Sequence, residues 1–72
     1  MTDYISDGAI KVIELIGVSE IGFEQAMQQA VSKAAETIQG ITGVEVLKQS
    51  ARVQDGVVCQ YRVNVRIAFV VQ

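Results

Sequence analysis

The segment from Val57 to Val71 alternates between apolar and polar residues, and this pattern constrains the fold more than any other feature of the sequence. Its even positions from 60 to 66 are polar, whereas its odd positions are all apolar or aromatic: Val57, Cys59, Tyr61, Val63, Val65, Ile67, Phe69 and Val71. A two-residue period is typical of a β-strand with one packed face and one solvated face. At about 3.3 Å per residue, this strand would be roughly 50 Å long.

A helix is predicted from Ser19 to Gln39. Its apolar residues recur with the period of one helical face: Phe23, Ala26, Met27, Ala30, Val31, Ala34, Ala35 and Ile38. Ser19 is expected to cap the first turn, and Gly40 to end the helix in a left-handed conformation. A helix of this length covers only about 30 Å, which is less than the predicted strand. We therefore expect another copy of the chain to bury the rest of the apolar strand face.

Two further strands complete the predicted fold. Ala9 to Gly17 and Val44 to Val53 are rich in β-branched residues, and residues 41–43 form a short connection between helix and strand. Asp55-Gly56 is a strong hairpin signal. This order predicts an α+β fold, β-α-β-β, with one long helix packed on a three-stranded antiparallel or mixed sheet. The last strand is expected to lie between the other two.

The size and composition of the chain also favour a homo-oligomer. With 72 residues, it can form one domain, which we place at residues 9–72 after a mobile arm at residues 1–8. Half of the residues are hydrophobic and the mean hydropathy is +0.33, which is high for a soluble monomer of this size. Cys59 is the only cysteine and histidine is absent, so neither an internal disulfide nor a zinc site is available.

The charge of the chain argues against several classes of partner. Six Lys and Arg residues against eight Asp and Glu residues give a net charge of −2, with no basic cluster in the sequence. Nucleic acid and anionic membranes are therefore not expected as partners. The apolar runs are far shorter than the roughly 20 residues of a membrane helix, and the first residues lack the pattern of a signal peptide. The free thiol fits a cytoplasmic location.

Nothing in the sequence indicates an enzyme. No nucleophile is paired with a general base and no phosphate-binding glycine loop is present, so no catalytic residue is assigned. Cys59 shares the apolar strand face and is expected to be a packed residue.

Several segments, taken in order, resemble the dodecin family. The strand from Lys11 to Ser19 ends in Gly-x-Ser and leads directly into an amphipathic helix, and the resemblance extends through the later strands to cover residues 9–71. It implies the β-α-β-β fold and the assembly of twelve copies into a hollow shell with the helices outward. It also implies a role in storing and buffering flavins rather than turning them over.

Two positions depart from the flavin-binding members of that family. Those members stack the flavin ring on a tryptophan that follows the helix, and they bond the ring edge with a glutamine that follows the last-strand tyrosine. The matching positions here are Gly43 and Arg62, so the chain resembles the tryptophan-less branch. Ring stacking contributes about 0.5–1.5 kcal/mol beyond area burial, and Gly43 offers none. By this resemblance the cofactor-binding candidates are Gly43, Glu45, Gln60 and Arg62, with a flavin bound weakly or in an altered pose.

The polar residues of the sheet leave alternatives open. The row Gln60, Arg62, Asn64 and Arg66 is either a solvated or interface-lining face, or an anion-binding surface. Glu14 and Glu45 are expected to pair with Arg62, Arg66 or Lys48, but acids from several subunits could together hold Ca²⁺ or Mg²⁺. The sequence is thus consistent with a small-molecule storage shell, an ion-binding shell, or a structural assembly without ligand.

Overall fold

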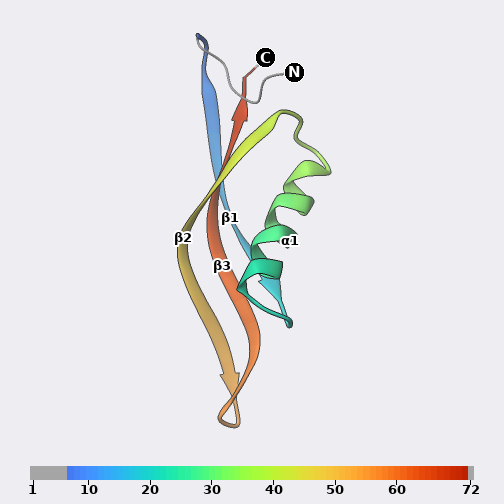
Figure 1. Ribbon diagram of the computed structural model, residues 1–72, viewed down its shortest axis with the longest axis vertical. Helices are drawn as coiled ribbons and strands as arrows, with labels where there is room; N and C mark the ends of the chain where they lie inside the picture. The colour runs from blue at the N-terminus through green and yellow to red at the C-terminus, as the bar shows by residue number, and fades with distance from the viewer. Residues whose placement is uncertain (1–6, 72) are drawn as a thin grey trace.

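The structure, a computed structural model, describes residues 7–71. Three strands and one helix follow in the order β1 (Ile10–Ser19), α1 (Phe23–Ala35), β2 (Ile41–Gln54) and β3 (Val57–Val70), as Figure 1 shows. Both β1 and β2 pair antiparallel with β3, which gives the sheet order β1-β3-β2. The predicted β-α-β-β fold is confirmed, with an entirely antiparallel sheet and the last strand in its centre.

The core lies between α1 and the odd-numbered face of β3. It consists of small residues on the helix and branched residues on the strand: Ala26, Ala30, Ala34, Val63, Val65 and Ile67. The short side chains on α1 let the helix lie close to the sheet. The contacting residue of β1 is also small: it is Gly17, where a Cβ would overlap the carbonyl oxygen of Ala26. The alternation that predicted a packed strand face is thereby confirmed for residues 61–67.

The predicted start of the helix was wrong by four residues. Ser19 is the last residue of β1, where it pairs with Tyr61 of β3. Its Oγ does accept an amide hydrogen bond, but from Ile21 at 2.9 Å, before the helix begins. The residue that precedes the first turn is Gly22, whose carbonyl accepts from the amide of Ala26. Pairing with β3 holds Ser19 extended, so its hydroxyl caps a turn and not the helix.

The predicted end of the helix and start of the second strand were also wrong. The helix ends at Ala35, and residues 41–43, predicted as a connection, belong to β2. Pairing of Ile41 with Phe69 extends the strand backwards, because β3 offers a partner along its whole length. Gly40 does adopt the expected left-handed backbone, with φ +79°, but it leads into β2 and does not cap α1.

The β2–β3 hairpin extends beyond the helix (Figure 1). Asp55 and Gly56 form its turn with φ of 53° and 77°, the positive values that a tight two-residue hairpin turn requires. Val57 and Val58, just after the turn, are 64% and 46% exposed. The molecule is 51 Å long but only 19 × 17 Å in cross-section. The expectation that one helix is too short to cover the whole strand is thus confirmed.

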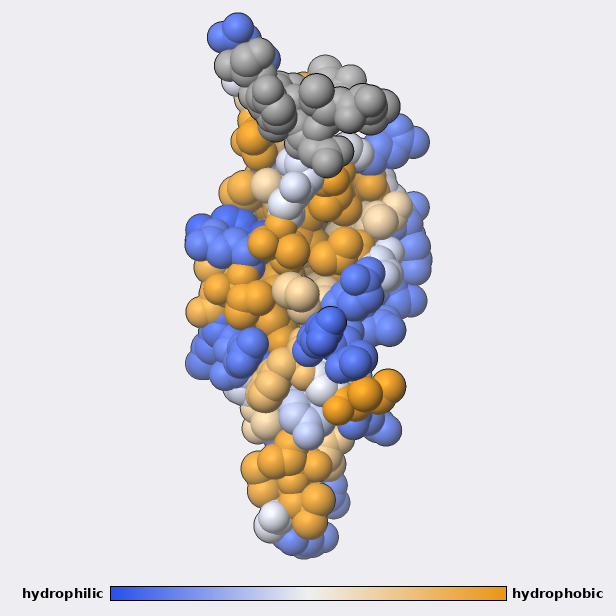
Figure 2. Space-filling view, viewed as in Figure 1, coloured by the Kyte–Doolittle hydropathy of each residue, from blue (hydrophilic) through white to orange (hydrophobic). Residues whose placement is uncertain are grey.

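Large apolar side chains are exposed on several sides of this elongated molecule. The helix packs mainly on β1 and β3, so β2 is left largely uncovered, with Val44 and Val46 exposed. Figure 2 shows hydrophobic surface beside the helix and at the hairpin tip. None of the helices in the described residues is both long enough and apolar enough to cross a membrane. The arm predicted at residues 1–8 falls largely on residues 1–6, which lie outside the described residues.

Candidate functional site

The sheet surface that faces away from α1, here called the helix-free face, carries most of the predicted site residues. On β3 it comprises Gln60, Arg62, Asn64, Arg66 and Ala68. Directly opposite residues of neighbouring strands point to the same side of a sheet, so their partners on β1 and β2 share this face. The register therefore determines which predicted residues can act together.

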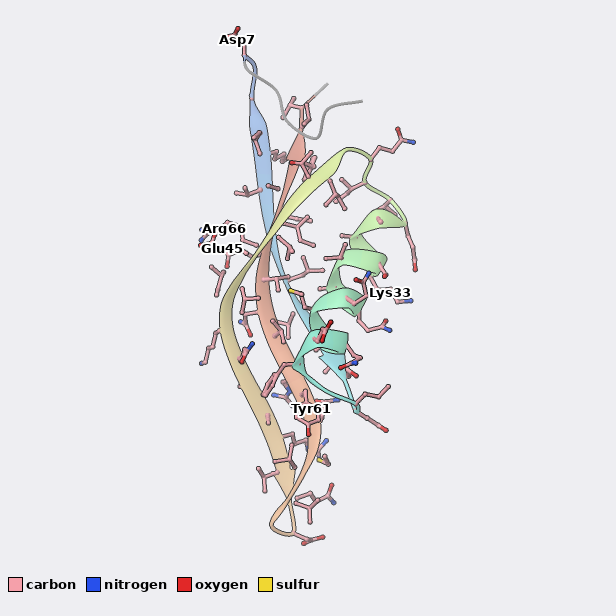
Figure 3. All side chains as sticks on the ribbon, in the orientation of Figure 1. Asp7, Lys33, Glu45, Tyr61 and Arg66 are labelled. Carbon is pink, nitrogen blue, oxygen red and sulfur yellow. The ribbon has the colours of Figure 1, made fainter. Side chains whose placement is uncertain are left out.

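Arg66 is the centre of an ion-pair network that ties all three strands together. It lies opposite Glu14 of β1 and opposite Glu45 of β2. Its Nη1 donates to Glu45 Oε1 at 3.2 Å, and its Nη2 lies 3.5 Å from Glu14 Oε2. In Figure 3, Arg66 and Glu45 point away from the helix. The prediction that both acids pair with a strand cation is confirmed, with Arg66 as the partner of each.

A shallow depression lies beside this network. It has a volume of about 250 Å³ and is lined by Val12, Gly43, Val44, Glu45, Arg66 and Ala68. It exists because Gly43 and Ala68 face each other across β2 and β3 with almost no side chain between them. A Cβ on Gly43 would meet only the Ala68 Cβ, at 4.0 Å. The depression thus has room for a larger group, with a charged rim and an apolar floor.

The four predicted cofactor-binding residues fall into two separate pairs within one chain. Gly43 and Glu45 line the depression, but Gln60 and Arg62 do not. Arg62 lies opposite Ser50, four positions along β3 from Arg66, a separation of about 13 Å. Its Nε donates to Gln60 Oε1 at 3.0 Å. Within one chain, Gln60 and Arg62 are therefore not part of the depression that Gly43 and Glu45 line.

Sequence reasoning did not name Val12 and Ala68 as site residues, and it named Arg66 only within the polar row of the last strand. Val12 and Ala68 are paired across β1 and β3, and they form the apolar floor of the depression beside Gly43. The signal was present in part, because the two-residue period places residues 66 and 68 on the same face as Gln60 and Arg62. What the sequence lacked was the register that brings Gly43 opposite Ala68.

The helix side of the sheet holds the remaining candidates. Tyr61 packs edge-on against Phe23, with ring centroids 4.9 Å apart and an interplanar angle of 79°. Figure 3 shows Tyr61 near the start of the helix. Cys59 is only half-buried and lies outside the core cluster, with its Sγ 3.6 Å from the carbonyl oxygen of Arg52. Tyr61 therefore packs against the core, whereas the prediction that Cys59 is a packed core residue was wrong, because this end of β3 extends beyond the helix. Neither residue lines the depression.

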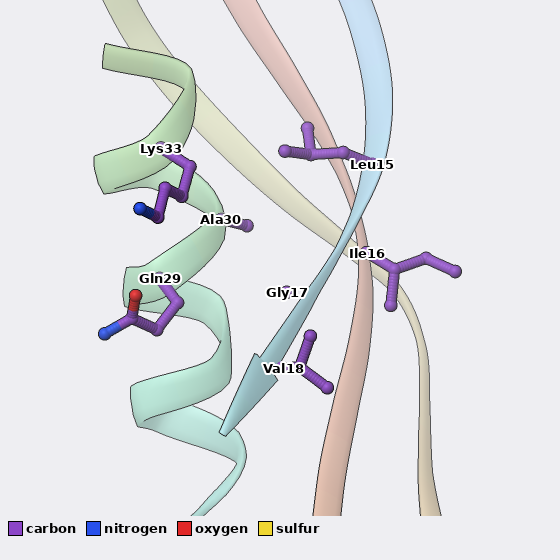
Figure 4. A pocket seen from close by; sticks show the side chains of 7 residues that line it. All are labelled: Leu15, Ile16, Gly17, Val18, Gln29, Ala30 and Lys33. Carbon is purple, nitrogen blue, oxygen red and sulfur yellow. The ribbon is translucent and has the colours of Figure 1, made fainter. Parts of the chain in front are cut away.

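A second hollow, of about 210 Å³, lies between β1 and α1 (Figure 4). Its walls are mostly apolar, and Gln29 and Lys33 supply its only polar side chains. Lys33 already pairs with Glu36 at 3.5 Å. Over residues 7–71, no group of three or more acidic, histidine or cysteine side chains is placed to hold a metal ion.

Comparison with known proteins identifies the family. The sequence model of the Dodecin family matches residues 9–72. The chain belongs to the dodecin family. Dodecin of Thermus thermophilus is 32% identical over 59 residues, which cover 82% of this chain and 86% of that one. Calcium dodecin of Mycobacterium tuberculosis is also 32% identical over 59 residues, covering 82% of this chain and 83% of that one.

Solved dodecin structures share the fold along almost their whole length. The structure of dodecin from Streptomyces coelicolor superposes with a TM-score of 0.90 at 28% sequence identity, covering 94% of this chain and 97% of that one. The crystal structure of the M. tuberculosis calcium dodecin gives a TM-score of 0.80 at 29% identity, covering 90% and 93%. The strand, helix and hairpin arrangement described above is therefore the dodecin arrangement.

Proposed function

We propose that the chain forms a closed homo-oligomeric shell of twelve copies, which binds and stores a small molecule without chemical turnover. The observation that carries this proposal is the amount of apolar surface that a single chain leaves exposed. On the helix-free face, β1 presents an apolar row that is between 43% and 54% exposed: Ile10, Val12, Ile16 and Val18. Fully burying an exposed side chain of this size contributes about 1.5–3 kcal/mol, so covering each of these half-exposed side chains contributes roughly half as much.

The distribution of that surface favours a closed assembly over a simple dimer. Val46 is exposed on the helix side of β2, and Val53 and Val57 are exposed at the hairpin tip. These residues lie on different sides of the molecule from the β1 row, so one two-fold contact cannot bury them all. A ring or shell in which each chain meets several neighbours can bury every one of these surfaces.

The depression at Gly43 is the proposed place for part of a ligand. Its apolar floor and the Arg66 guanidinium suit a flat, partly polar molecule of the flavin type, because arginine stacks on and donates to such rings. Gly43 provides no aromatic surface, so we expect weaker binding than an aromatic residue would give. In a shell, Gln60 and Arg62 of a neighbouring copy could complete the contacts that one chain lacks.

Flavin titration tests the ligand half of this proposal. Freshly purified protein is scanned near 450 nm for a bound chromophore, and flavin fluorescence is then followed as protein is added. We expect saturable but incomplete quenching. Unchanged fluorescence at saturating protein would exclude the flavin as ligand while leaving the shell intact.

Calcium is a second candidate ligand, and one relative is named for it. Glu14 and Glu45 supply carboxylates on one face, as a Ca²⁺ site requires, but both are already engaged by Arg66. A calcium site would therefore need further oxygens from a neighbouring copy. A rise in Tm with Ca²⁺ that EDTA reverses would support this candidate, and an unchanged Tm would count against it.

We place this function in the cytoplasm, where the half-buried thiol of Cys59 would stay reduced. We expect the role to be one of binding and not of catalysis.

A further inference from the structure

The hairpin half of the helix-free face gathers three of the six cations of the chain. The β2–β3 register sets Lys48 opposite Asn64, Ser50 opposite Arg62, and Arg52 opposite Gln60. All six residues therefore point to the side away from α1. Lys48 and Arg52 are both diagonal neighbours of Arg62, a separation of about 7–8 Å. We call Lys48, Arg52 and Arg62 the basic patch.

No carboxylate compensates this charge in the part of the chain that the structure describes. The ion pairs there involve only Lys33 and Arg66, and none reaches the basic patch. On β1, the partners of Arg62 and Asn64 are Val18 and Ile16, which carry no charge. Asp55, in the hairpin turn, forms no ion pair with Arg52. All three cations are exposed, so they are free to meet an anion.

Within the basic patch, Arg62 is held in place by a hydrogen bond to Gln60. The Nε of Arg62 donates to Gln60 Oε1 at 3.0 Å, which holds the guanidinium from behind. Its two terminal nitrogens are left to form paired hydrogen bonds, the geometry in which arginine binds phosphate oxygens. The Ser50 hydroxyl and the Asn64 amide lie among the cations and add neutral donors.

We propose that the basic patch binds a small anion with at least two adjacent phosphate groups. Three cations on one sheet face match the multiple charges of a diphosphate better than those of a single phosphate, and lysine and arginine side chains are long enough to converge on it. A long polyanion fits less well, because Glu14 and Glu45 line the other end of the same face and would repel it. The inference shares Arg62 with the proposed function, in which that residue of a neighbouring copy completes a ligand contact, and the assembly would repeat the patch in every copy.

Calorimetric titration with inorganic pyrophosphate tests the inference on the purified, assembled protein. We expect one saturable site per chain whose affinity falls as salt is added. Arg62→Gln should weaken binding about tenfold, as expected for loss of hydrogen bonds to a charged ligand. Lys48→Gln and Arg52→Gln should weaken it in the same direction, and Arg62→Lys should lie between Arg62→Gln and the wild type. These residues are exposed, and equal melting temperatures would show that the variants fold.

Lys33→Gln is the matched control, because it removes the same charge from α1, on the opposite side of the sheet from the basic patch. If Lys33→Gln weakens binding as much as Arg62→Gln, the effect is one of net charge and the site is refuted. The same follows if the wild type does not bind pyrophosphate, or if orthophosphate binds equally well. Tighter binding of a single-stranded oligonucleotide through Arg62 would instead assign the patch to nucleic acid and overturn the proposal.

Native mass spectrometry of the same samples separates this inference from the proposed shell. A dodecamer that does not bind pyrophosphate refutes the patch and leaves the shell standing. A monomer that binds pyrophosphate refutes the shell and leaves the patch, which is complete within one chain.

Discussion

Gly17 of β1 lies so close to Ala26 of α1 that a Cβ on Gly17 would overlap the Ala26 carbonyl oxygen. The same Cβ would lie 3.0 Å from the Ala30 Cβ. Helix and sheet therefore touch backbone to backbone at this point, and the distance between the two layers is set here. Close contact lets the small residues of α1 meet Val63 and Val65 without a gap.

Gly17→Ala is expected to destabilise the fold strongly. The clash is with backbone, which cannot move aside as a flexible side chain can, so the cost should exceed the usual 1–3 kcal/mol of an overpacked core. We expect a large fall in Tm or in soluble yield, measured by thermal melting of the purified protein. Gly43→Ala is the control, since its added Cβ meets only the Ala68 Cβ at 4.0 Å and should leave Tm nearly unchanged. Equal effects of the two substitutions would contradict this account of the helix–sheet contact.

Ile16→Lys is expected to disrupt assembly while the single chain keeps its fold. Ile16 is 54% exposed on the helix-free face and makes no part of the core, so its loss should matter only where another copy covers it. Light scattering should show a smaller species, and circular dichroism should still show helix and strand. Gln28→Lys, on the exposed side of α1, introduces the same charge and should leave the assembly intact. A full-size assembly of Ile16→Lys would mean that this row is not an interface.

Gly43→Trp is expected to raise affinity for flavin. The depression has room for the ring, and stacking alone should contribute about 0.5–1.5 kcal/mol, with burial of the ring adding to this. Affinity should therefore rise roughly tenfold or more. Fluorescence titration of wild type, Gly43→Trp and Gly43→Leu separates stacking from mere filling of space. If Gly43→Leu binds flavin as well as Gly43→Trp, stacking is not the missing contact.

The Arg66 network is expected to contribute little to stability, although it ties the three strands together. Glu14 and Glu45 have side chains that are 65% and 64% exposed, and exposed ion pairs contribute about 0–1 kcal/mol. Glu45→Gln should lower the free energy of unfolding by less than about 1 kcal/mol, and high salt should reduce that difference further. Denaturation in urea at low and high salt measures both effects. A loss of several kcal/mol would mean that the pair is buried by a neighbouring copy.

Local signals predicted most of the fold. The alternation in residues 57–71 gave the central strand, and Asp55-Gly56 gave the hairpin turn, because both depend on residues that are adjacent in sequence. The apolar stripe gave the buried face of α1, including Ala26 and Ala30. The start of the helix and the start of β2 were wrong because sheet pairing, which is non-local, holds Ser19 and Ile41 in strands.

The candidate site was harder to predict for the same reason. Glu45 and Arg66 were both noticed, but only the register places them opposite each other, with Glu14 on the other side of Arg66. Gly43 was singled out by resemblance. The depression forms there because Gly43, which has no side chain, is paired with Ala68, whose side chain is small. Pairing across a sheet with register shifts, as between Ile41 and Gly43, cannot be read from spacing alone.

Native mass spectrometry of the freshly purified protein tests the central claim most directly, because it reports the number of chains and any bound small molecule together. We predict a mass of twelve chains, with any retained ligand seen as added mass. A monomer of 7.8 kDa at micromolar concentration would contradict the claim that other copies cover the exposed apolar rows.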